Sequence, residues 1–146
     1  MMPASLSVLA RRLNFIRETA PNDGAWVNFC QRFTHNNPGD SWCASFVSLI
    51  LDIAYHGKPP LVRSASTQVL LAEAAAKGWI VDRAEVDDLY FYVKNGVPHH
   101  VGICSNITPS GVEGISGNTS PDGSSSNGTG VFEHAIGPAV FVRVKP

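Results

Sequence analysis

The sequence predicts a single α+β domain in which N-terminal helices pack on a roughly six-stranded antiparallel sheet. The chain has 146 residues, close to the size of one domain, and no repeat or linker divides residues 1–146. Helical spacing of apolar residues fills the first half, and short β-branched and aromatic segments follow Gly78. Helices followed by strands that neighbour one another in sequence are typical of α+β folds. With 44% apolar residues, the chain can bury a hydrophobic core.

Four segments of the first half are predicted to be helical. In residues 5–19, apolar side chains recur at helical spacing until a proline and an Asn-Asp-Gly turn follow. A shorter helix is expected over about 25–33. Residues 64–77 are rich in alanine, begin with serine and end at Gly78. The fourth segment, 41–55, is the most apolar of them.

The helix over 41–55 is expected to form the buried centre of the domain. A Pro-Gly pair precedes it, and Asp40 or Ser41 could cap its first turn. At 100° per residue its polar side chains fall in one narrow stripe, and the rest of its surface is apolar. The stripe consists of Ser41, Ser45, Ser48 and Asp52.

After Gly78 the pattern changes to short strands separated by Gly, Pro and Asn turns. The predicted strands cover residues 79–83, 88–94, 99–105, 111–117, 130–135 and 139–145. Between the fourth and the fifth, the Gly-, Ser- and Asn-rich stretch from Asn118 to Gly130 is predicted to be a mobile surface loop.

Composition excludes several classes of function. The net charge is −1, with no basic cluster beyond Arg11 and Arg12, so a charge-driven nucleic-acid partner is not expected. No apolar run approaches the length of about 18 residues that a membrane span requires. The N-terminus lacks the pattern of an ordinary signal peptide, so we expect synthesis in the cytoplasm. The three cysteines, Cys30, Cys43 and Cys104, are predicted to form neither a disulfide framework nor a thiolate zinc site.

Cys43 is the candidate nucleophile. It lies in the first turn of the 41–55 helix, where free N–H groups and the helix dipole favour a thiolate. On the helical wheel it faces away from the polar stripe and towards the expected sheet. The alternative interpretation is a buried small apolar residue, since free cysteine is commonly buried. Cys104 is the competing nucleophile because it shares a strand face with His100.

His100 is the candidate base. In a strand, His100 and Gly102 point to one face and His99 to the other. If the face of His100 meets the helix, Gly102 would permit close approach and bring the imidazole to the helix N-terminus. The alternative is an ordinary strand histidine. The adjacent histidines point to opposite faces, so no metal site is expected.

A third residue could orient the histidine by accepting its second N–H group. Asn118 ends the next predicted strand, although it could equally be a turn residue. Glu113 is the rival. Strand alternation would point Glu113 and Asn118 to opposite faces, so both could not orient the same histidine.

Three blocks in this order resemble the cysteine, histidine-dependent amidohydrolase/peptidase (CHAP) family of the papain-like NlpC superfamily. They are Ser41–Val47 (SWCASFV), His99–Ile103 (HHVGI) and Gly117–Ser120 (GNTS). The resemblance covers about residues 35–145, and residues 1–34 form a helical part of the same domain. His99 replaces the glycine that is usual in the family. Asp87 stands where the family often has the glycine of a Gly-Asp-hydrophobic sequence. Many members carry glutamate where this chain has Ser116.

The resemblance implies a papain-like core and a peptidoglycan hydrolase, like a phage endolysin, that cleaves an amide bond. It assigns Cys43 as nucleophile, His100 as base and Asn118 as orienting residue, with Ser41 and Trp42 at the oxyanion site and cleft. No cofactor or metal is implied, and a monomer that reaches the cell wall by release or export is expected. The alternatives are an effector or toxin that cleaves or deamidates a protein, and a non-catalytic wall-binding module.

Overall fold

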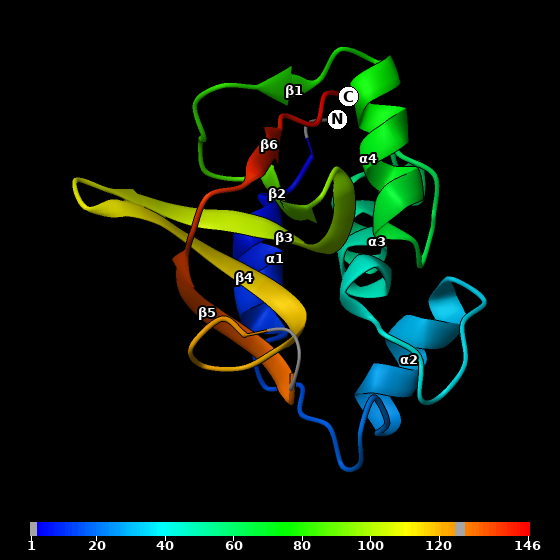
Figure 1. Ribbon diagram of the computed structural model, residues 1–146. Helices are drawn as coiled ribbons and strands as arrows, with labels where there is room; N and C mark the ends of the chain where they lie inside the picture. Colours follow the sequence, from blue (N-terminus) through cyan, green and yellow to red (C-terminus); the bar gives the residue numbers. More distant parts are fainter. Residues whose placement is uncertain (1–2, 125–127) are drawn as a thin grey trace.

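The computed structural model describes residues 3–124 and 128–146, and this part of the chain has an α+β fold of four helices and one six-stranded antiparallel sheet (Figure 1). The helices are α1 (Leu6–Arg12), α2 (Ala25–Phe33), α3 (Cys43–Ala54) and α4 (Thr67–Ala76). The strands are β1 (Ile80–Val81), β2 (Leu89–Lys94), β3 (Val97–Thr108), β4 (Gly111–Thr119), β5 (Gly130–Ile136) and β6 (Val140–Val142). The predicted fold class is confirmed at this level.

The sheet has the strand order β1-β6-β2-β3-β4-β5, and every neighbouring pair is antiparallel. Strands β2 to β5 form a meander, and β6 returns to the outer edge of β2. Helices α1, α3 and α4 all contact β3, and α1 and α3 also contact β4. The centre of the sheet therefore lies against the N-terminal helices, as the sequence predicts.

Helix α3 is buried along most of its length, which matches the prediction for 41–55. Its polar residues are satisfied by neighbouring segments: Ser45 bonds to Thr34, and Ser48 bonds to the backbone of Ser64. The predicted cap is wrong, because Trp42 is the N-cap residue and no side chain caps the helix. No helix in the described part of the chain is long and apolar enough to cross a membrane.

The predicted helix over 5–19 is too long. Helix α1 ends at Arg12, because the residues that follow pair with the start of β5. The Val131 N–H donates to the Ile16 carbonyl at 3.1 Å, and the Glu18 N–H donates to the Thr129 carbonyl at 2.7 Å. The segment therefore bonds to the start of β5 and does not continue the helix, although its apolar residues have helical spacing.

The predicted loop from Asn118 to Gly130 is shorter than expected at both ends. Asn118 and Thr119 belong to β4, and Gly130 begins β5. Residues 125–127, on which the prediction of mobility also falls, lie outside the described residues.

The two faces of β3 have different surroundings. Val101 and Ile103 join the hydrophobic core on the side of the helices. In the register with β2, His100 is opposite Tyr92 and Gly102 is opposite Tyr90, so these side chains share the other face. His100 is nevertheless 1% exposed, so a histidine lies in a closed environment outside the apolar core.

Candidate active site

Cys43 is the first residue of α3, and its side chain is 4% exposed. The thiol lies beside β3, where it contacts the backbone N–H group of Val101. The pairing between β3 and β4 begins only at Ile103, so the sheet is open on the β4 side at this point. Since Val101 directly follows His100, the Cys43 thiol lies next to the backbone of the strand segment that carries His100.

Burial raises the pKa of the Cys43 thiol, although the N–H groups of Val101, Ala44 and Cys43 and the side chain of Ser41 act in the opposite direction. The sequence predicts a thiolate at this helix N-terminus. The direction of this pKa shift is opposite to that expectation, because desolvation of the anion outweighs its hydrogen-bond donors.

His100 is buried in its neutral form. Burial lowers the pKa of its imidazole to about 3, and the nearby His134 and His99 contribute in the same direction. Its Nδ1 atom has no hydrogen-bond partner among the described residues. The neighbouring His99 is exposed, so the replacement of glycine at that position does not fill the space around His100. The neutral imidazole keeps a nitrogen lone pair, which is what a general base uses to accept a proton.

Ser116 is the hydrogen-bond partner of His100. The Ser116 Oγ atom lies 2.9 Å from His100 Nε2, and both side chains are buried. The hydrogen bond predicted between Asn118 and His100 is therefore wrong. The sequence contained a clue, because Ser116 occupies the position where the CHAP motif often has glutamate. The prediction considered only the missing carboxyl group at this position and not the hydroxyl group that is present.

Asn118 lies nearby, but its side chain contacts Ser41, next to Cys43, and not His100. Its Nδ2 group donates to Ser41 Oγ at 2.8 Å, and Ser41 in turn contacts the Cys43 thiol. Asn118 has a left-handed backbone, with φ of 54°, and the β4–β5 register shifts between Ser116 and Thr119. Strand alternation thus fails after Ser116, which is why the side chain of Asn118 leaves the face of His100.

Trp42 supports the helix from inside the core. Its side chain is fully buried, and its Nε1 group donates to Glu18 Oε2 at 2.8 Å. The predicted cleft role is therefore wrong for its side chain, because a fully buried indole cannot line an open cleft. Its backbone remains next to Cys43, at the start of α3.

Glycines shape both sides of the site, but not as predicted. A Cβ atom on Gly102 would lie 2.5 Å from the ring of Tyr90, so Gly102 makes room for that ring and not for α3. The close approach to α3 comes from Gly117, where a Cβ atom would lie 2.7 Å from Trp42 and 2.9 Å from Phe46.

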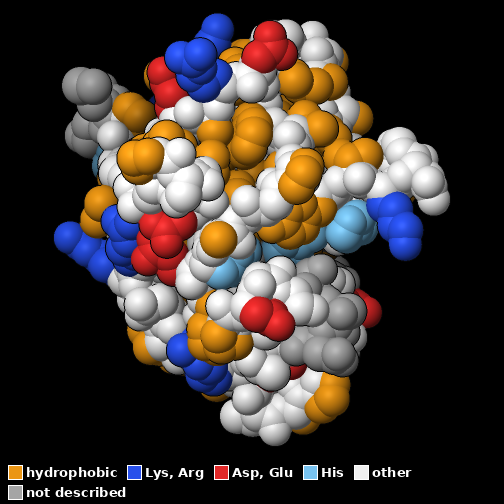
Figure 2. All heavy atoms as spheres, turned by 60° about the vertical axis from the view of Figure 1, so that its left-hand side comes forward, with side chains coloured by type: hydrophobic (Ala, Val, Ile, Leu, Met, Phe, Trp, Pro, Cys, Tyr) orange, Lys and Arg blue, Asp and Glu red, His pale blue; other side chains and the backbone are white. Residues whose placement is uncertain are grey.

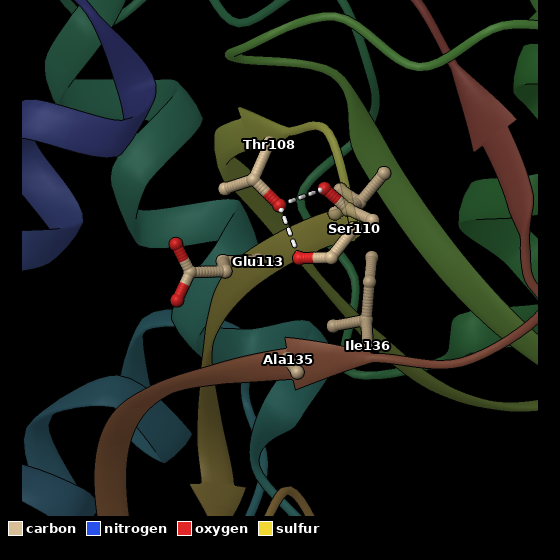
Figure 3. A pocket seen from close by; sticks show the side chains of 7 residues that line it. Thr108, Ser110, Glu113, Ala135 and Ile136 are labelled. Carbon is tan, nitrogen blue, oxygen red and sulfur yellow. Dashed lines mark hydrogen bonds between the residues drawn. The ribbon is translucent and has the colours of Figure 1, made fainter.

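The two rival residues, Glu113 and Cys104, have other surroundings. Glu113 accepts a hydrogen bond from Asn106 at 2.8 Å and lines a small pocket near the β3–β4 turn, together with Thr108 and Ser110 (Figure 3). Cys104 is buried, and burial together with the acidic Asp88 raises the pKa of its thiol to about 12. Neither residue is a partner of His100 among the described contacts.

Figure 2 shows histidine side chains gathered in a hollow across one face, next to a patch of hydrophobic side chains. Within the described residues, no three His, Cys, Asp or Glu side chains come together as a metal site. No protein-family model, curated protein or solved structure matches the chain. The arrangement provides a thiol, a neutral imidazole and helix N-terminal N–H groups, which are the elements needed for acyl transfer through a cysteine.

Proposed function

We propose that this chain is a CHAP-type cysteine amidase or endopeptidase with a papain-like core, and that it hydrolyses an amide bond in peptidoglycan. The observation that carries the proposal is the contact between the Cys43 thiol and the N–H group of Val101, directly after a buried His100 whose Nδ1 atom has no described partner. The order of the three sequence blocks around Cys43, His100 and Asn118 supports the family assignment.

In the proposed reaction, His100 takes the proton of the Cys43 thiol as the sulfur attacks the carbonyl carbon of the amide. The raised pKa of the thiol and the lowered pKa of the imidazole favour this coupled transfer over a preformed ion pair. N–H groups in the first turn of α3 stabilise the negative charge on the carbonyl oxygen.

The imidazolium then donates its proton to the amine nitrogen as the carbon–nitrogen bond breaks, which leaves a thioester on Cys43. His100 next removes a proton from water, and the resulting hydroxide attacks the thioester carbon. The carbon–sulfur bond breaks, and the sulfur recovers its proton. The Cys43 thiol and the His100 imidazole are both poorly exposed in the folded chain. Because peptidoglycan lies outside the cytoplasm, the protein would act after release or export.

Digestion of purified peptidoglycan, followed by mass spectrometry of the released fragments, tests this proposal. Wild type should release fragments with one new amine and one new carboxyl group, and their masses would identify the N-acetylmuramoyl-L-alanine bond or a peptide bond. Cys43→Ala should release none while keeping the circular dichroism spectrum of the wild type. Cys104→Ser is the matched control, a second buried thiol that should be dispensable. Equal inactivity of both variants, or an intact wall after treatment with wild type, would overturn the proposal.

A further inference from the structure

A cluster of buried polar side chains adjoins His100. Ser116 Oγ is 2.9 Å from His100 Nε2 and 3.4 Å from His134 Nε2. Tyr90 Oη is 3.5 Å from the same nitrogen of His134. All four side chains are buried, and apart from His100 the proposed reaction uses none of them.

One hydrogen bond of the cluster has a fixed donor and acceptor, and it determines the direction of the others. His134 Nδ1 lies 2.9 Å from the carbonyl oxygen of Ala135, which can only accept, so Nδ1 carries a hydrogen. In neutral His134 the Nε2 atom then carries the lone pair and accepts the hydroxyl hydrogen of Ser116, the closer of its two hydroxyl neighbours. With its hydrogen directed at His134, the Ser116 oxygen accepts the Nε2–H group of His100.

The opposite arrangement is less favourable. It would place the hydrogen of His100 on Nδ1, where the described residues offer no acceptor. A buried N–H group without a partner is rarer in proteins than a buried acceptor without one. Both observations assign the hydrogen of His100 to Nε2 and the lone pair to Nδ1.

The cluster is closely packed, which keeps these rings in place. A Cβ atom on Gly123 would lie 2.7 Å from His134 Nδ1, and Cβ atoms on Gly102 and Gly114 would each lie 2.5 Å from the ring of Tyr90. Three glycines thus leave room for two rings that a longer residue would displace.

We infer that Ser116 and His134 are positioning residues that hold the hydrogen of His100 on Nε2 and leave the Nδ1 lone pair free to act as the base. The catalytic role in this inference rests on the proposed function. The tautomer itself can be measured without any substrate.

Nitrogen-15 NMR of the histidine side chains, with two-bond proton correlation, tests the inference. In wild type at neutral pH, His100 should give the pattern of an imidazole protonated on Nε2. Ser116→Ala should convert this pattern into a mixture of both tautomers, and Ser116→Thr should restore the wild-type pattern because it keeps the hydroxyl. Ser48→Ala, which removes another buried and hydrogen-bonded hydroxyl, is the control and should leave His100 unchanged.

Kinetics on peptidoglycan give the second measurement. Ser116→Ala should lower kcat by about tenfold or more with KM nearly unchanged, and Ser116→Thr should recover most of the loss. A wild-type His100 protonated on Nδ1 would overturn the inference even if the enzyme is active. An unchanged tautomer in a folded Ser116→Ala variant would overturn it as well. Failure of wild type to digest peptidoglycan, with the predicted tautomers present, would overturn the proposed function and leave the hydrogen-bond assignment supported.

Discussion

Acidification should destabilise this protein through His100, whose imidazole is buried in its neutral form. Burial, with smaller contributions from His134 and His99, lowers its pKa in the folded state to about 3. In the unfolded chain the pKa of a histidine is about 6.5. Between these two values the unfolded chain binds the proton and the folded chain does not. The contribution of His100 to stability is therefore complete above about pH 6.5 and is lost as the pH falls towards about 3.

The size of this effect follows from the two pKa values. Each pH unit inside the window lowers the free energy of unfolding by about 1.4 kcal/mol for one proton. From about pH 7.5 to about pH 4.5 the loss amounts to about 3 kcal/mol, and over the whole window to about 5 kcal/mol. A domain of this kind has a total stability of about 5–15 kcal/mol, so acid should unfold it readily.

Urea denaturation over a series of pH values measures the effect. Wild type should lose about 3 kcal/mol more than His100→Gln between about pH 7.5 and about pH 4.5, because glutamine takes up no proton. His99→Gln is the matched control, since His99 is exposed on the same strand and should keep most of the wild-type slope. Parallel curves for wild type and His100→Gln would refute the reasoning, whatever the stability of the variant at neutral pH.

Three other predictions follow from the site. Alkylation of Cys43 by iodoacetamide should be slow at neutral pH and should rise about tenfold per pH unit up to at least pH 8.5, because burial raises the pKa of the thiol; a plateau below pH 7 would indicate a resting thiolate. Gly117→Ala should destabilise the fold by about 1–3 kcal/mol in thermal denaturation, since its Cβ would overlap α3, whereas Gly137→Ala has open space and should be close to neutral. Asn118→Ala should slow peptidoglycan turnover through loss of its bond to Ser41, and Glu113→Ala should leave the rate near wild type; the reverse ranking would contradict the geometry.

Much of the fold could be predicted because local patterns and tertiary packing agree. The apolar 41–55 segment forms α3, and the segments after Gly78 form six strands in the predicted order, although β3 is longer and β1 and β6 are shorter than predicted. The prediction failed where a distant partner decided the structure. Residues after Arg12 have helical spacing, yet they pair with the start of β5, and nothing within the segment itself indicates that partner.

At the site, residue types were easier to predict than their contacts. The predicted positions of Cys43 at a helix N-terminus and of His100 in a strand are confirmed, because both have recognisable sequence patterns. The orienting residue was misassigned, because the left-handed backbone of Asn118 interrupts the alternation on which the prediction depended. His134 was not among the predicted site residues, since its contact with Ser116 arises only when β5 pairs with β4.

The pairing of Ile16–Glu18 with Thr129–Val131 has a consequence for the nascent chain. These backbone bonds join segments that are synthesised far apart in time. Contacts between distant parts of a sequence form late and slow folding. Cys43 therefore leaves the ribosome well before β5, the strand that carries His134. We expect the site to be complete only after β5 has been synthesised.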